Sequence, residues 1–212
     1  MTDKPWGISV TVDHSVLVTF VQSSLVVEYT THGQPLRHIR LPDDVLHPLH
    51  ACWLPSGQLV VSHGDGADAL HRLCAFDVDD GRATTAVALD GRRPASVNHE
   101  TILDVTELEY LVGSDVAMDV PGHLVVDRLS GLVVVADVNN SRLLTVDRIL
   151  RRCSVLLELA AEQEFPVRLC LDEARRRLYV AYNGDVRNGR WTAGSVLVFF
   201  FGCQDFQKGK AD

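Results

Sequence analysis

Two histidines and one arginine stand at matching points of a repeated sequence pattern and are the first candidates for chemistry. His50, His123 and Arg168 each lie two residues after a proline, and Gly7 occupies the fourth position of this kind. Neutral imidazoles bind zinc and related transition metals, so two histidines brought together by the fold could hold an ion. However, two histidines without a third ligand or a carboxylate at the same level fall short of the usual ligand count for zinc. We therefore expect no metal and no resident cofactor, and treat the three residues as candidates for an interaction face.

A second candidate interface lies in the polar stretch 183–194. Trp191 stands there beside Arg187 and Arg190. An exposed tryptophan flanked by arginines is typical of protein–protein interfaces. These three residues join the candidates for the interaction face.

Other residues that suggest chemistry have simpler interpretations. Asp137 with Asn139 and Asn140 could bind a metal or a sugar, but Asp and Asn at turns more commonly form hydrogen bonds with backbone amides. His47 is separated from His50 by Pro-Leu and is interpreted as a surface residue. The sequence contains no Gly-x-Ser-x-Gly elbow, phosphate-binding glycine loop or dinucleotide fingerprint. No established catalytic motif therefore supports an enzyme.

The net charge disfavours a nucleic-acid partner. Twenty Lys and Arg against 28 Asp and Glu give a charge of −8, and an acidic protein repels phosphate backbones unless a local basic face overrides the field. Arginines do cluster within 148–152 and 175–177, but both stretches fall in predicted turns, where charged residues are normally solvated. RNA binding stays open as an alternative, for which the diagnostic property is strong salt dependence.

Composition indicates an ordinary globular protein. The 212 residues are 46% hydrophobic and 23% charged. The N-terminal sequence lacks the basic-then-apolar run of a signal peptide, and the longest apolar run, Val196 to Phe201, is too short to span a bilayer. The five cysteines are widely spaced and form no Cys-x-x-Cys pair, which suits reduced thiols. We expect a soluble, cytoplasmic protein that has no membrane partner.

An internal repeat predicts the elements that position the candidate residues. Four segments begin at Pro5, Pro48, Pro121 and Pro166, and each continues as a short apolar strand, a turn and a second apolar strand. The prolines are separated by 43, 73 and 45 residues, which corresponds to a repeat of about 40 to 50 residues with one insertion. In the third unit four β-rich runs are divided by turn residues, and the run 132–137 is apolar enough to be buried on both faces. A four-stranded meander repeated at this period is typical of a β-propeller blade.

The repeat predicts an all-β fold, a β-propeller with about four blades. We place the blades at 5–47, 48–90, 121–160 and 166–203, with an insertion at about 91–120 and short tails at 1–4 and 204–212. The fourth unit has three clear strands and no clear fourth.

The third unit also resembles the NHL-repeat family. The likeness runs from Pro121 to Val146 and is strongest at Val135-Ala-Asp-Val-Asn-Asn. The stretches from Leu169 and from Ser195 are similar to the last blade of the NHL propellers of animal tripartite-motif-like proteins. The resemblance implies a propeller that usually has six blades, so the chain would be incomplete relative to that ring. It implies no ubiquitin-ligase activity, because the RING, B-box and coiled-coil modules have no counterpart in the sequence.

Together these patterns favour a non-enzymatic NHL-repeat propeller module that binds a protein on its loop-bearing face. The alternative is a metal-dependent channel-site hydrolase or lyase similar to the gluconolactonase-like propellers. We also expect self-association, because an incomplete ring leaves apolar blade faces uncovered. The residues expected on those faces are Leu17, Val18, Phe20 and Val26 in the first unit, and Leu197, Phe199, Phe200 and Phe201 in the last.

Overall fold

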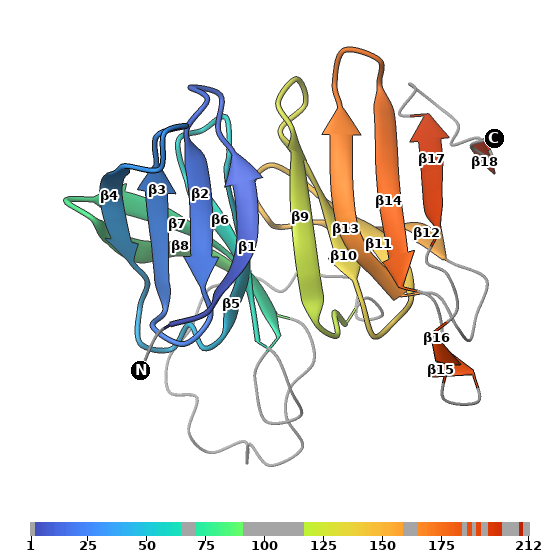
Figure 1. Cartoon of the computed structure of the whole chain (residues 1–212), viewed down its shortest axis with the longest axis horizontal. Helices are drawn as coiled ribbons and strands as arrows, with labels where there is room; N and C mark the ends of the chain where they lie inside the picture. Colours follow the sequence, from blue (N-terminus) through green and yellow to red (C-terminus); the bar gives the residue numbers. More distant parts are fainter. Residues whose placement is uncertain are drawn as a thin grey trace.

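The chain forms antiparallel β-sheets that are placed side by side (Figure 1). This computed structural model describes residues 3–64, 71–90, 117–158, 165–183, 186–187, 190–191, 195–200 and 208–209. Every regular element within these ranges is a strand. The described residues include no helix that is long and apolar enough to cross a membrane.

The first two units are four-stranded meanders that share an outer edge. The first consists of β1 (Pro5–Val10), β2 (Val16–Phe20), β3 (Leu25–Tyr29) and β4 (Pro35–Arg40). The second consists of β5 (Pro48–Trp53), β6 (Leu59–His63), β7 (Arg72–Asp79) and β8 (Arg82–Asp90). A parallel bridge between Arg40 and Arg82 connects β4 to β8, so the two units form one eight-stranded sheet.

The third and fourth units are separate four-stranded sheets. The third consists of β9 (Pro121–Asp127), β10 (Leu132–Asp137), β11 (Arg142–Val146) and β12 (Cys153–Glu158). The fourth consists of β13 (Phe165–Asp172), β14 (Arg177–Asn183), β17 (Val196–Phe200) and the short β18 (Lys208–Gly209). A two-stranded hairpin of β15 (Val186–Arg187) and β16 (Arg190–Trp191) lies between β14 and β17 in the sequence.

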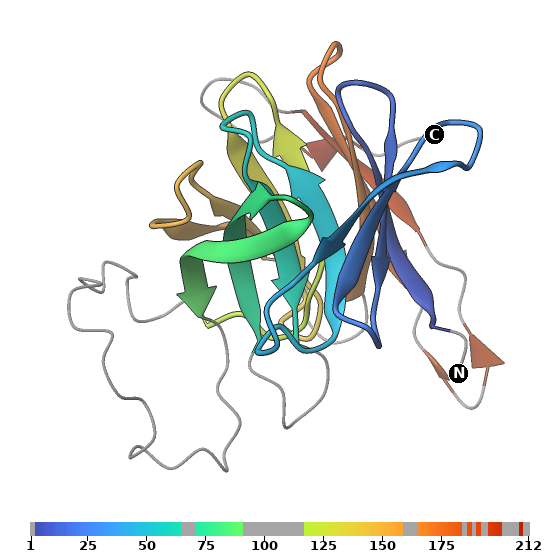
Figure 2. The same cartoon turned by 90° about the vertical axis from the view of Figure 1, so that its left-hand side faces the viewer.

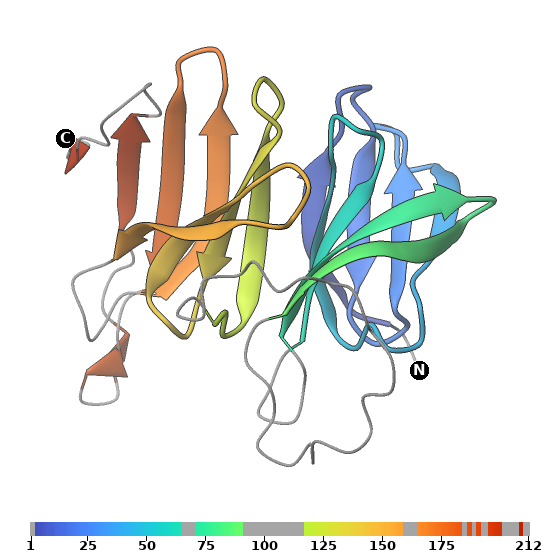
Figure 3. The same cartoon turned by 180° about the vertical axis from the view of Figure 1, so that it is seen from behind.

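The first strands of the four units lie next to one another. β1 packs against β5, β5 against β9, and β9 against β13, and the sheets fan outward from these inner strands (Figures 2 and 3). Radial sheets around a shared inner edge are the arrangement of a β-propeller. The all-β propeller predicted from the sequence is therefore the observed fold.

In the described part of the chain, the core consists of three apolar clusters, each between two successive units. Strand β10 explains why the clusters are continuous, because its side chains alternate between the two neighbours. Val133 and Val135 join the cluster with the second unit, whereas Val134 and Ala136 join the cluster with the fourth. All four side chains are fully buried. The prediction that the run 132–137 is buried on both faces is confirmed.

Strands β5 and β9 begin at Pro48 and Pro121 themselves, because proline is tolerated at the first position of a strand. One detail of the strands differs from the sequence-based prediction. In the fourth unit β18 pairs with β17 and supplies a short fourth strand from the segment expected to be a tail. Residues 91–116 of the expected insertion lie outside the described residues.

The expectation for the apolar end faces was wrong at four positions. Leu17 and Val26 are buried against the second unit, Phe199 is buried against the third, and the half-buried Leu197 packs against the same cluster as Phe199. Consecutive residues of a strand point to opposite faces, so a run such as Leu17-Val18 cannot lie on one surface. The outer face of the first unit instead exposes Ile8 and Val10. The side chain of Phe200, and Phe201 as a residue, lie outside the described part of the chain.

Candidate functional site

Each of the four units has a residue two positions after its first proline, and these four residues are structurally equivalent. In β1, β5, β9 and β13 the pairing register shifts between the proline and this residue, so that one residue bulges out of the ladder. Such a β-bulge kinks the strand and re-aims the following side chain. The shared bulge places Gly7, His50, His123 and Arg168 at the same point of the inner edge, as the repeat indicated. We call this row the inner-edge residues.

His50 and His123 lie in direct contact. Their ring centroids are 3.8 Å apart and the rings are tilted by 35°. His50 Nε2 lies 3.0 Å from the carbonyl oxygen of Ile8, and His50 Nδ1 lies 3.4 Å from the amide nitrogen of Leu124. The backbone amide can only donate, so His50 accepts at Nδ1 and donates from Nε2. The His50 imidazole is therefore neutral and connects the first unit to the third.

His123 repeats this arrangement one unit further along. Its Nδ1 lies 3.4 Å from the amide nitrogen of Leu169, which is the residue equivalent to Leu124. At the other end of the row, a side chain on Gly7 would come within 2.3 Å of the carbonyl oxygen of Leu49, so this position accepts only glycine. The inner-edge residues thus fix the spacing between neighbouring units.

The surroundings keep both histidines uncharged at neutral pH. Burial lowers the pKa of His50 to about 4; its hydrogen bond to Ile8 acts in the opposite direction, and the charge of Arg168 adds to the lowering. Burial, together with His50 and Arg168, lowers the pKa of His123 to about 2. Neutral imidazoles could in principle bind a metal, but both nitrogens of His50 already bond to protein atoms. The described residues contain no group of three His, Cys, Asp or Glu side chains that could hold an ion.

The half-buried thiols of Cys52 and Cys153 are not activated. Burial raises the pKa of Cys52 to about 12, against the effect of a hydrogen bond from Ser9. Burial, and secondarily the charge of Asp137, raises the pKa of Cys153 to about 11. A nucleophilic cysteine needs a depressed pKa, so neither thiol has the properties of one.

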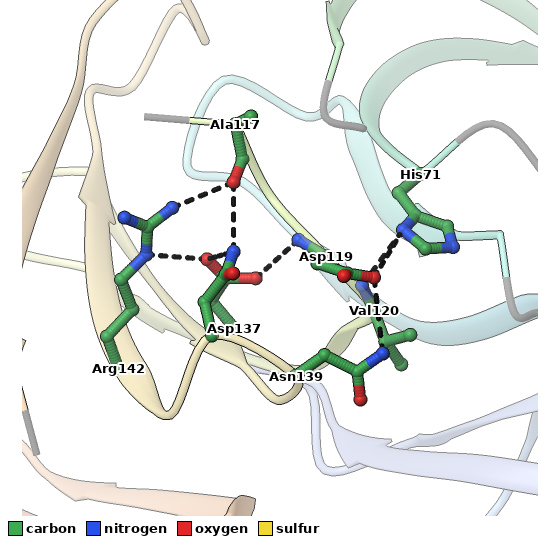
Figure 4. Close-up of polar contacts among 8 residues, drawn as sticks. His71, Ala117, Asp119, Val120, Asp137, Asn139 and Arg142 are labelled. Atoms are coloured by element: carbon green, nitrogen blue, oxygen red, sulfur yellow. Dashed lines mark hydrogen bonds and ion pairs between the residues drawn. The ribbon is translucent and has the colours of Figure 1, made fainter. Parts of the chain in front are cut away.

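Asp137 forms the centre of a polar cluster at the end of β10 (Figure 4). Its Oδ1 accepts a hydrogen bond from the amide of Asp119 at 2.6 Å, and its Oδ2 accepts from Arg142 Nε at 2.7 Å and from Asn140 Nδ2 at 2.8 Å. Arg142 and Asn140 also donate to the carbonyl oxygen of Ala117. The carboxylate thus ties the chain that enters β9 to the β10–β11 turn.

The same cluster extends to the second unit. His71 Nδ1 lies 3.1 Å from Asp119 Oδ1 and 3.1 Å from the amide nitrogen of Val120 (Figure 4). Asn139 Nδ2 donates to Asp119 Oδ1 at 3.2 Å. Burial raises the pKa of Asp137, against the lowering effect of its hydrogen bonds. Because protein donors occupy both Asp137 oxygens, the cluster fits the turn-forming role expected from the sequence.

The opposite end of the third unit presents charged and apolar side chains to solvent. Three turns meet there, 128–131, 147–152 and 173–176, and we call their combined surface the turn end. Figure 1 shows the β9–β10 and β13–β14 turns at one end of the molecule and the β15–β16 hairpin at the other, which we call the loop end. On the turn end, Leu129 is 80% exposed and Ile149 is 50% exposed.

Ion pairs between the third and fourth units hold the turn end in place. Arg176 binds Asp127 through two hydrogen bonds, at 2.8 and 3.1 Å, and the carboxylate is almost fully buried. Burial acts to raise the pKa of Asp127, but the hydrogen bonds from Arg176 and Ser130 outweigh it and leave the pKa below the ordinary value. Arg128 contacts Glu173 through both its amide and its guanidinium. The β9–β10 turn is therefore a fixed platform.

The remaining predicted candidates are spread over the molecule. Arg168 is exposed beside His123, and its charge affects both histidines. Arg187, Arg190 and Trp191 lie in the β15–β16 hairpin, where Arg187 pairs with Arg190 across the strands. Leu129 and Ile149 were not predicted from the sequence. The sequence feature that could have indicated them is an aliphatic residue within a polar, arginine-rich turn, where no buried face requires an apolar side chain.

Comparison with known proteins supports the fold and no more. The sequence matches no family model and no curated protein. Among solved structures, hydrazine synthase of Kuenenia stuttgartiensis superposes with a TM-score of 0.55 at 10% identity, over 91% of this chain and 49% of that one. A gluconolactonase of Xanthomonas campestris gives 0.54 at 16% identity, over 86% and 55%. Virginiamycin B lyase of Staphylococcus aureus gives 0.51 at 13% identity, over 92% and 55%.

This chain therefore spans about half the length of the solved structures it resembles. All three of these neighbours are enzymes by name: a synthase, a lyase and a gluconolactonase. At such low identity, a shared fold does not transfer an activity. The comparisons show a β-propeller fold.

Proposed function

We propose that this chain is a non-enzymatic propeller module of the NHL-repeat type that binds a protein partner in the cytoplasm. The observation that carries the proposal is the turn end, where the exposed Leu129 stands on a turn fixed by ion pairs and the exposed Ile149 stands on the neighbouring turn. Rigid platforms with apolar anchors and arginines are typical of protein interfaces. The free thiols of Cys52, Cys74, Cys153 and Cys170 suit a reducing compartment.

The charge of the turn end defines the partner. The three turns and the strand residues that flank them on both sides contain seven arginines and four carboxylates, whereas the chain as a whole carries a charge of −8. The carboxylates are already engaged, since Asp127, Asp172 and Glu173 pair with arginines and Asp147 accepts from the amide of Arg151. Arg148, Arg151 and Arg152 stay exposed around Ile149. The surface therefore fits an acidic peptide segment that carries aliphatic side chains.

This choice of face differs from the sequence-based expectation. The loop end was expected to bind the partner because its connections are long. His50 and His123 are buried there, and their polar groups form hydrogen bonds within the protein. The turn end is therefore the proposed interface, while Arg187, Arg190 and Trp191 remain candidates on the loop end.

A peptide selection tests the proposal. The purified chain would be panned against a displayed library of random peptides, and the enriched peptides measured by equilibrium titration. We expect enrichment of segments that combine Asp or Glu with Leu, Ile or Val, with binding lost in Leu129→Asp and Arg151→Glu. Arg40→Glu is the matched control, because Arg40 is an exposed arginine at the far end of β4. This variant should bind the peptides normally. If the enriched peptides bound Leu129→Asp and Arg151→Glu as tightly as the native chain, the proposal would be refuted.

Two other functions make different predictions. RNA binding through the same arginines would give affinity that falls steeply with salt and lacks dependence on Leu129. A channel-site enzyme would give a stoichiometric metal that is lost when His50 and His123 are replaced. The hydrogen bonds that occupy both nitrogens of His50 favour the binding module over the enzyme.

A further inference from the structure

The outer face of the first unit repeats the residue pattern of surfaces that are buried elsewhere in the chain. Val18 of β2 pairs with Ile8 of β1, and the equivalent pairs in the later units are Val61 with Ala51, Val135 with Leu124, and Val180 with Leu169. In those three pairs, each side chain is at most 5% exposed. Ile8 is 64% exposed. The first unit therefore has an interface face that lacks its neighbour among the described residues.

The fourth unit presents the complementary half of the same interface. In the third unit, Leu143 pairs with Ala136, and both pack against Leu169 of the following unit. The equivalent row in the fourth unit is Arg168, Ala181 and Val196. Val196 is 54% exposed, whereas Leu143 is fully buried. Among the described residues, the surface of the fourth unit that would contact the residue equivalent to Ile8 in a following unit is thus uncovered as well.

The inner-edge residues add a match in size. Neighbouring inner-edge side chains touch, as His50 and His123 do. If the fourth unit packed against a first unit, Arg168 would lie beside Gly7. The longest of the four side chains would then face the one position of the row that has no side chain. Apolar faces that complement each other in this manner mark an interaction site.

We propose that the outer face of the first unit, formed by Ile8, Val10, Val16, Val18 and Phe20, binds the fourth unit of a second copy of this chain. Two such contacts, related by a two-fold axis, join two arcs into one closed ring. The two end faces support this occupant, because each presents the residues that its counterpart packs against between successive units of the chain. A head-to-tail contact closes into a ring when the rotation per copy fits, and otherwise gives open filaments. The surface is separate from the turn end.

Light scattering coupled to size exclusion tests this assembly on the 212-residue chain. The buffer contains reductant, because Cys170 is an exposed free thiol. We expect twice the chain mass of 23.4 kDa at micromolar concentration, independent of further dilution over tenfold. Ile8→Asp should convert the protein to a monomer. The side chain of Ile8 is exposed within one copy, so the substitution should disrupt the contact between copies and leave the fold intact. Leu129→Asp, an equally exposed aliphatic on the turn end, should leave the dimer intact.

A mixing experiment distinguishes a ring from other dimers. Val196→Lys should also give monomers, and mixing it with Ile8→Asp should restore the dimer, because one interface then pairs the new charges and the other is native. A monomeric native chain would overturn the proposal. So would a dimer that Val196→Lys leaves intact, since that would join first units to each other. Masses above two copies would show open association and would also contradict the ring.

Discussion

The loop end and the turn end of the third unit both carry charged side chains, but they use them differently. At the loop end the carboxylate of Asp137 accepts three hydrogen bonds from protein donors and is fully buried. At the turn end Asp127 is equally buried, but the neighbouring Leu129, Arg148 and Arg151 are exposed. The difference shows that residues typical of active sites serve the fold here, whereas an ordinary turn provides the accessible surface.

The largest effect should come from the loop end. Replacing Asp137 by Ala leaves Arg142 and the amide of Asp119 without their buried acceptor, which should lower the free energy of unfolding by about 3 kcal/mol. Asp172→Ala is the control, since it pairs with an exposed arginine and should change stability far less. Urea unfolding of both variants measures the difference. Equal losses would mean that the Asp137 cluster is not the structural centre of the loop end.

The histidine pair should make stability depend on pH. The pKa values of about 4 for His50 and about 2 for His123 lie below the value of 6.5 that an unperturbed histidine has. Above pH 6.5 both histidines are neutral whether the chain is folded or unfolded. Below it the unfolded chain gains protons first, so each histidine lowers stability by about 2 kcal/mol between pH 6.5 and 5.

His123→Gln removes one of these contributions while keeping an acceptor for the amide of Leu169. Denaturation midpoints at pH 7 and pH 5 should therefore differ less in this variant than in the native chain. The same pH dependence in both proteins would show that His123 is accessible to protons in the folded state.

A smaller effect is expected within the turn end. Gly131 has a φ of 74°, and a Cβ there would lie 2.8 Å from Cβ of Arg148, so Gly131→Val should cost about 2 kcal/mol. Ser130→Ala should cost about 1 kcal/mol, because it removes the hydrogen bond from the hydroxyl to Asp127 Oδ2. Thermal melts rank the two variants. A Ser130→Ala variant less stable than Gly131→Val would contradict this description of the turn.

The smallest change in stability should accompany the largest change in binding. Leu129→Asp alters a side chain that is 80% exposed, so the free energy of unfolding should stay within about 0.5 kcal/mol of the native value. Calorimetry measures this directly. A substantially destabilised variant would show that Leu129 supports the fold rather than the interface.

Much of the fold could be predicted from the sequence because the signals are local. The continuous apolar run in Leu132–Asp137 predicted a strand buried between two neighbours, and the Pro-x-His spacing predicted equivalent positions for His50 and His123. The contacts of these histidines could not be predicted, since they depend on backbone amides in the next unit. The pairing of Asp127 with Arg176, 49 residues apart, also depends on how two units pack. Exposure of Leu129 follows from that packing, which explains why the turn end was missed.

One measurement tests the division between the two ends most directly. A peptide selected on the native chain is titrated into His123→Gln and into Leu129→Asp under identical conditions. We expect His123→Gln to bind within about twofold of the native affinity, and Leu129→Asp to bind at least about tenfold more weakly, which is roughly 1.4 kcal/mol. Loss of binding in His123→Gln with full binding by Leu129→Asp would contradict this assignment and place the site on the inner edge.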